Sequence, residues 1–150
     1  MGKKRIIKEE KEKLIKESDR LELQLKKDLK LKINQKIKLG RLYIFSSYNN
    51  TIFTLTDEEG KTIYWTSAGR MGFKGTKKGT PYAASKAAEI VARAISQLKI
   101  PEVEILVKGV GAGRDAALRT LAAREINIVS IKDVTPIPHD GPRPPKVRRV

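Results

Sequence analysis

The order of apolar patterns between residues 41 and 135 restricts the fold of this chain more than any other feature. Three short runs of β-forming residues come first, and short polar turns separate them. The runs are residues 42–45, 52–56 and 62–66. Short turns between β-rich runs are typical of antiparallel strands joined in a meander.

A helix–strand–helix–strand pattern follows the three β runs. Thr80 and Pro81 suit the cap and the first position of a helix, and small apolar residues then recur at helical spacing. That stripe consists of Ala84, Ala87, Ala88, Val91, Ile95 and Leu98. Residues 103–107 predict a strand, 115–124 a second helix and 126–131 a last strand. Because a strand–helix–strand unit pairs its strands in parallel, the sequence predicts an α/β fold, a mixed β-sheet with two packed helices.

Charge and composition divide the chain into three parts. The 150 residues include 32 Lys and Arg against 17 Asp and Glu, a net charge of +15. Residues 41–135 contain all the aromatic residues and most of the Gly and Ala, so we expect them to form the globular domain. Residues 1–40 are a basic N-terminal extension, and residues 136–150 are a basic C-terminal tail with five of the seven prolines.

The N-terminal extension itself has two patterns. Residues 3–20 are strong helix formers with Glu and Lys at helical spacing. From residue 21 to residue 39, odd positions are apolar except Lys27 and Gln35, and even positions are polar, which is typical of a strand. The alternative is a flexible tail that orders only on a partner. The sequence favours this alternative, because nothing in the extension can bury both faces of a strand.

Composition excludes several classes of function. Cysteine is absent, which removes disulfides, thiolate nucleophiles and Cys-ligated metals, and the single His argues against a His-based metal site or triad. No apolar run approaches the roughly 18 residues of a membrane span. We therefore expect no metal, cofactor, small-molecule substrate or membrane, and a polyanionic partner, most commonly nucleic acid.

Residues 69–80 combine four glycines with four basic residues just before the first predicted helix. Glycines let backbone amides approach phosphates, cations neutralise them, and helix N-termini favour anions. The spacing is not that of a Walker loop. The segment predicts phosphate binding, with a solvated surface loop as the alternative. Its candidate residues are Arg70, Lys74, Lys77 and Lys78.

A second glycine-rich turn, residues 108–114, follows a predicted strand and opens a predicted helix. It resembles a dinucleotide-binding turn, and Asp133 lies 24 residues after Gly109, but Arg114 occupies the third glycine position. We interpret the turn as a nest of backbone amides, with Lys108 and Arg114 on RNA phosphates. A nucleotide-dependent enzyme and a purely structural tight turn remain alternatives.

Two polar turns have simpler interpretations. Tyr48, Asn49 and Asn50 could stack on and hydrogen-bond to unpaired bases, or could form only an Asn-rich hairpin turn. Residues 57–59 are three adjacent acids that end in Gly, which indicates a solvated turn. An acid–base or metal site would need carboxylates from separate elements.

The proline-rich tail is predicted to be stiff and extended. Stiffness lowers the cost of ordering on binding, and Arg side chains suit phosphate. The basic ending favours RNA over the alternative, a protein groove for proline-rich ligands. The candidate residues are His139, Arg143, Lys146, Arg148 and Arg149.

These motifs together resemble the small-subunit ribosomal protein S11 family, of the bacterial or organellar type. The resemblance runs from about residue 40 to residue 150 and keeps the order of the motifs. It is carried by residues 48–52, 66–69, 72–75, 80–84, 108–114 and 133–139. Three departures stand out: Asp140-Gly141-Pro142 replaces Asn-Gly-Cys, Val110 and Ala112 replace a proline-bearing turn, and the N-terminal extension is longer.

The resemblance implies a ribonuclease H-like α/β fold and a structural, non-enzymatic role in the small ribosomal subunit. It implies contacts with the central domain of 16S-type ribosomal RNA on the platform, near the exits of mRNA and tRNA. The neighbours would be proteins of the S7, S18 and S21 families, in a cytoplasmic rather than an organellar ribosome. A basic protein that compacts DNA remains an alternative.

Overall fold

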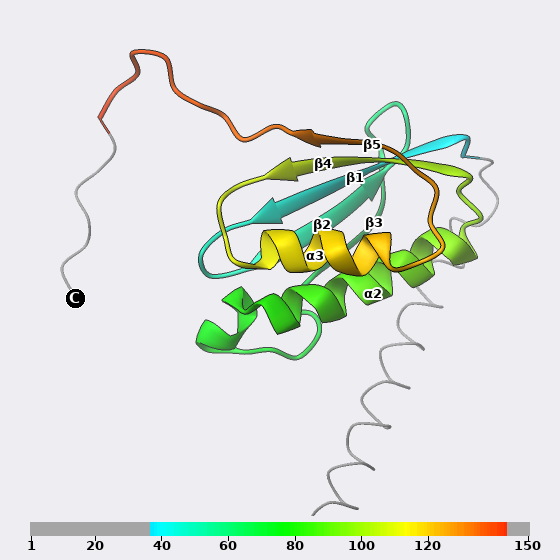
Figure 1. Cartoon of the computed structure of the whole chain (residues 1–150), viewed down its shortest axis with the longest axis horizontal. Helices are drawn as coiled ribbons and strands as arrows, with labels where there is room; N and C mark the ends of the chain where they lie inside the picture. The colour runs from blue at the N-terminus through cyan, green and yellow to red at the C-terminus, as the bar shows by residue number, and fades with distance from the viewer. Residues whose placement is uncertain (1–36, 144–150) are drawn as a thin grey trace, which may run out of the picture.

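The computed structural model describes residues 37–143, which fold into one mixed β-sheet with two helices (Figure 1). The strands are β1 (Leu39–Ser46), β2 (Thr51–Thr56), β3 (Thr62–Ser67), β4 (Glu102–Lys108) and β5 (Ile128–Asp133). The two α-helices are α2 (Pro81–Gln97) and α3 (Gly113–Ala122), and a short 3-10 helix, η1 (Gly75–Gly79), precedes α2. The predicted α/β fold, an antiparallel meander followed by strand–helix–strand, is therefore confirmed.

The sheet has the strand order β3-β2-β1-β4-β5. β2 runs antiparallel to both β1 and β3, whereas β4 runs parallel to both β1 and β5. Strand β1 therefore lies at the centre, with the meander on one side and the parallel unit on the other. This arrangement agrees with the ribonuclease H-like layering that the resemblance implies.

Helices α2 and α3 pack on the same face of the sheet (Figure 1). The apolar stripe predicted for α2 is buried as expected, except that Leu98 is only partly buried. Its small alanines let the helix lie close to Leu42, Ile44, Phe53 and Leu55 in the centre of the sheet. Removing these large side chains from water supplies the main stabilisation of the domain.

Several element boundaries differ from the prediction by one to three residues, and the starts of the last helix and the last strand have an identifiable cause. Helix α3 begins at Gly113 rather than Asp115, because the Arg114 amide already donates to the Gly111 carbonyl (3.2 Å). Strand β5 begins at Ile128 rather than Ile126, because the Ile126 amide is bonded to the Arg124 carbonyl in a tight turn (2.8 Å). Both shifts come from turn hydrogen bonds that apolar periodicity does not reveal.

The topology brings several element ends to one side of the molecule. The carboxyl ends of β1, β3, β4 and β5 and the amino ends of α2 and α3 lie together, on the left in Figure 1. We call this side the carboxyl edge. The turn between β2 and β3 lies at the opposite edge.

Some predictions fall on residues that the structure does not describe. These are the helix over residues 3–20, the alternating segment up to residue 36, and the tail residues Lys146, Arg148 and Arg149. Within residues 37–143, no helix has the length and apolar character needed to span a bilayer.

Candidate nucleic-acid interface

Three motifs that are far apart in the sequence meet at the carboxyl edge. They are the turn between β1 and β2, the glycine-rich loop before α2, and the turn between β4 and α3. Glycines allow the contacts: a Cβ placed at Gly79 would lie under 3.0 Å from the Tyr48 carbonyl oxygen. A Cβ at Gly109 or Gly111 would lie equally close to the carbonyl oxygens of Ser46 or Ser47. The glycines of two motifs therefore pack on the backbone of the third.

The turn between β1 and β2 combines a fixed backbone with exposed side chains. The Ser47 amide donates to the Asn50 carbonyl (2.9 Å), and the Asn50 amide donates to Ser47 Oγ (3.2 Å). Tyr48 is 79% exposed, Asn49 is exposed, and Asn50 is half-buried. A hairpin turn therefore joins β1 and β2, and it leaves the Tyr48 ring exposed to solvent.

The loop before α2 presents lysines to solvent. Lys74 and Lys77 are exposed, Lys78 is partly buried, and none of the three forms an ion pair with a described residue. Packing of Phe73 edge-on against Tyr82 (5.9 Å between centroids) ties the loop to α2. The loop therefore offers three positive charges at a defined place on the carboxyl edge.

Arg70 is held more tightly than the lysines of the same loop. Its guanidinium donates to the Trp65 carbonyl (3.0 Å) and lies over the rings of Tyr64 and Trp65 (5.9 and 5.2 Å). A stacked guanidinium keeps its charge and further N–H donors. Arg70 is thus fixed in place by its aromatic neighbours before any ligand binds.

The start of α2 confirms the predicted cap and limits what the helix terminus can bind. Thr80 is the N-cap, and its Oγ1 accepts from the Ala83 amide (3.3 Å). The Ala84 amide donates to the Thr80 carbonyl (3.2 Å), and Pro81 has no amide hydrogen. The amides of Ala83 and Ala84 are therefore not available to an anion, and the lysines of the preceding loop add positive charge beside this helix terminus.

The predicted nest of backbone amides in residues 108–114 is wrong at three positions. The Gly109 amide donates to Thr135 Oγ1 (3.0 Å), the Gly111 amide to the Ser46 carbonyl (3.0 Å), and the Arg114 amide to the Gly111 carbonyl (3.2 Å). In a dinucleotide-binding turn the third glycine allows close packing of helix and strand; here the close packing occurs at Gly113, one residue before Arg114. A Cβ there would lie under 3.0 Å from Thr51 Oγ1 and Ala84 Cβ.

Arg114 is oriented by an acid that sequence reasoning did not assign to it. Its Nη2 lies 2.6 Å from Asp133 Oδ2, and its Nη1 donates to the Gly109 carbonyl (3.1 Å). Asp133 also accepts from the Thr135 hydroxyl and amide (2.6 and 2.9 Å). The Thr135 hydroxyl and then Arg114 lower the pKa of the Asp133 carboxyl to about 2.

The Asp133 network also fixes where the C-terminal tail leaves the domain. The Val134 amide donates to the Val107 carbonyl (2.8 Å), so the chain stays beside β4 for one residue after β5 ends. His139 and Arg143 follow and are exposed. The only sequence signal for this network is an Asp two residues before a Thr, a local pattern typical of an Asx turn.

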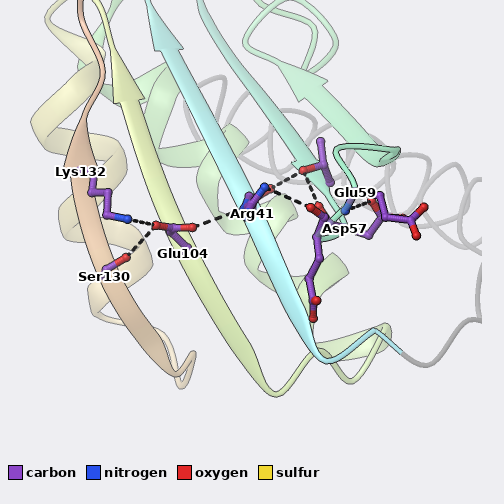
Figure 2. A network of polar contacts seen from close by, with 8 residues as sticks. Arg41, Asp57, Glu59, Glu104, Ser130 and Lys132 are labelled. Carbon is purple, nitrogen blue, oxygen red and sulfur yellow. Dashed lines mark hydrogen bonds and ion pairs between the residues drawn. The ribbon is translucent and has the colours of Figure 1, made fainter.

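The three adjacent acids of residues 57–59 lie in the turn between β2 and β3, at the opposite edge; Asp57 and Glu59 are labelled in Figure 2. The Asp57 carboxylate accepts from the amides of Glu59 and Lys61 (3.1 and 2.8 Å), so it caps the turn, and the predicted solvated turn is confirmed. Among residues 37–143, no group of three or more His, Cys, Asp or Glu could hold a metal ion. The charge asymmetry therefore comes from the carboxyl edge, where Arg70, Lys74, Lys77, Lys78 and Arg114 concentrate positive charge that favours a polyanion.

An α/β domain with a basic, glycine-lined edge belongs to the class of nucleic-acid-binding scaffold proteins. The family model of ribosomal protein S11 matches residues 40–149, and the chain belongs to this family. Membership makes it a structural protein of the small ribosomal subunit that binds ribosomal RNA and lies among other ribosomal proteins.

Proposed function

We propose that this chain binds the central domain of 16S-type ribosomal RNA on the platform of the small subunit, through the carboxyl edge and both basic extensions. The place would be near the exits of mRNA and tRNA, beside proteins of the S7, S18 and S21 families. The convergence of three separate motifs at one basic edge carries the proposal. The RNA-contacting residues would be Tyr48, Asn49, Asn50, Arg70, Lys74, Lys77, Lys78, Arg114, His139 and Arg143, continued by Lys146, Arg148 and Arg149.

The loop lysines would provide most of the attraction to phosphate in the folded domain. Lys74, Lys77 and Lys78 have no ion pair with a described residue to give up, so each can release counterions from the RNA. Arg114 already donates hydrogen bonds to the Asp133 carboxylate and the Gly109 carbonyl, which fix its orientation. Its remaining N–H groups would donate to a phosphate.

Base recognition would come from the turn between β1 and β2. The exposed Tyr48 ring can stack on an unpaired base, and the Asn49 amide can pair with a base edge. The backbone bonds of Ser47 hold both side chains at the edge before RNA arrives. A preorganised turn lowers the entropy cost of binding.

The geometry argues against the nucleotide-dependent enzyme. A dinucleotide turn needs free amides for the pyrophosphate and a free acid for the ribose. Here the amides of Gly109 and Gly111 are bonded within the chain, and Asp133 is paired with Arg114.

The test is a salt titration of the full chain with a central-domain fragment of 16S-type RNA. A variant with Lys74, Lys77 and Lys78 changed to Gln should flatten the slope of log Kd against log salt by about 2–3, because each phosphate contact contributes nearly one unit. The control changes Lys61, Lys99 and Arg119 to Gln and removes the same charge; all three are exposed, lie away from the carboxyl edge and fall outside both basic extensions.

The two triple variants separate oriented binding from general attraction. The control should keep the parent slope to within about half a unit. Equal losses in both variants would show unoriented attraction to any polyanion and would refute the proposed interface. Equal affinity for duplex DNA of matched length would support the DNA-compacting alternative.

A further inference from the structure

The face of the sheet opposite α2 and α3 is not covered by any helix of residues 37–143. Tyr43 and Phe45 of β1 lie on this open face and are 37% and 42% exposed. Trp65 of β3 is 52% exposed on the same face, two strands away in register with Tyr43. Adjacent exposed aromatic side chains in a folded domain usually mark an interaction surface.

A hollow of about 260 Å³ lies on the open face across β1 and β4. Its lining residues are Tyr43, Ile44, Phe45, Leu106, Lys108 and Val134. Known small-molecule sites generally range from about 300 to 1,000 Å³, so this hollow is of a size to take one side chain. Its walls are mostly apolar, with little to bond the polar edges of a nucleobase.

Lys108 is the one charged group in the hollow. It is exposed, and it is the partner of Phe45 in the register of the parallel β1–β4 pair. It forms no ion pair with a described residue. A single cation beside an apolar hollow complements an apolar side chain with a neighbouring carboxylate. Lys108 ends β4 at the carboxyl edge, but it lines the hollow of the open face, and we therefore assign it to a protein partner instead of the RNA phosphate that the sequence suggested.

Two other cations of the open face, Arg41 and Lys132, are already held in ion pairs within the domain (Figure 2). Glu104 of β4 lies between Arg41 of β1 (3.4 Å) and Lys132 of β5 (2.5 Å), and it also accepts from the Ser130 hydroxyl (3.2 Å). Arg41 further donates to the Glu58 carbonyl (3.1 Å). An RNA phosphate would have to compete with these bonds, whereas the lysines before α2 have none to lose.

We propose that the open face is the docking surface for a partner protein, which inserts an apolar side chain into the hollow and pairs a carboxylate with Lys108. The inference rests on the chain being part of the small subunit and not on the platform position. RNA would then hold the carboxyl edge and protein the open face. Each surface has the chemistry of its own partner.

The test places the photo-crosslinking amino acid p-benzoylphenylalanine at Phe45 of the full chain, in purified small subunits. We expect cross-links to another polypeptide, at a segment in which an apolar residue lies within a few positions of Asp or Glu. The same probe at Tyr48, on the carboxyl edge, should cross-link to RNA. Lys108→Glu should lower the protein cross-link about tenfold or more, because it sets two like charges together. Lys61→Glu, at the opposite edge, should leave the yield unchanged.

Each other outcome counts against the proposal. Cross-links from position 45 to RNA would make the open face a base-stacking surface, and cross-links to residues 1–36 or 144–150 would make this chain its own occupant. If the probe at position 45 forms no cross-link while the probe at position 48 does, the open face contacts only solvent. Lys108→Gln, which removes the charge without reversing it, should lower the yield less than Lys108→Glu. If position 48 fails to reach RNA while 45 reaches protein, the proposed interface fails and the docking surface stands.

Discussion

Adding one methyl group at Gly109 tests how closely the carboxyl edge is packed. Its φ is +99°, and a Cβ there would lie under 3.0 Å from the Ser46 carbonyl oxygen. A left-handed conformation costs an L-residue about 1–2 kcal/mol, and forcing an atom into a packed site costs about 1–3 kcal/mol. Alanine also lowers the entropy of the unfolded chain by up to about 1 kcal/mol. Gly109→Ala should therefore destabilise the domain by about 2–4 kcal/mol.

Two further glycines separate these contributions. Gly60 has φ +86° and no atom within 4 Å of a Cβ, so Gly60→Ala measures the conformational cost alone, about 1 kcal/mol. Gly79 has no positive φ but would meet the Tyr48 carbonyl oxygen, so Gly79→Ala measures the steric cost alone, about 1–3 kcal/mol.

Urea unfolding followed by circular dichroism is the assay, and an m-value of about 1–3 kcal/mol/M converts the midpoints to free energies. We expect Gly60→Ala to cost the least and Gly109→Ala the most. If Gly109→Ala costs no more than Gly60→Ala, the turn does not pack against the β1–β2 hairpin. The convergence of motifs that carries the proposed RNA interface would then be lost.

Three other substitutions test separate parts of the structure. Thr80→Ala removes the N-cap of α2 and should cost about 1 kcal/mol in urea unfolding. Ser85→Ala removes a hydroxyl at a half-buried position of the same helix, outside the cap, and should stay within about 0.5 kcal/mol. Phe53→Ala opens a cavity in the core and should cost about 3–5 kcal/mol of unfolding free energy. Phe45→Ala, on the open face, should cost about 1 kcal/mol or less. Equal costs would contradict the assignment of the two side chains to opposite faces of the sheet. Asp133 has a lowered pKa, so its stabilisation should be complete above pH 4 and decline as the pH falls toward 2. The difference in melting temperature between the parent and Asp133→Asn should follow that course, and a difference independent of pH would contradict the Arg114 and Thr135 contacts.

Local signals in the sequence predicted the elements well. Thr80 and Pro81 marked the start of α2 because a cap and an N1 proline act within one helical turn. The stripe of alanines marked the buried face of α2 because helical periodicity depends on a few neighbouring residues. The turn at residues 57–60 was equally local, since Asp57 bonds amides two and four residues away.

Contacts between distant segments were beyond the sequence. The spacing of glycines in residues 109–113 suggested an amide nest, but Ser46 and Thr135 occupy two of those amides from other parts of the chain. Arg114 and Asp133 are 19 residues apart and meet only because β5 pairs with β4. Neither the hydrogen bonds of these glycine amides nor the contact between Arg114 and Asp133 produces a periodic pattern of residues in the sequence.

The sequence by itself determined the α/β class, the family, the place of the helices and strands, and the positive charge that requires a polyanionic partner. Each of these depends on residue type and short-range spacing. The tertiary structure decided which cations remain free for phosphate, because only the order and register of strands place Glu104 between Arg41 and Lys132. It also left one sheet face uncovered with Lys108 beside an apolar hollow, because both helices pack on the other side.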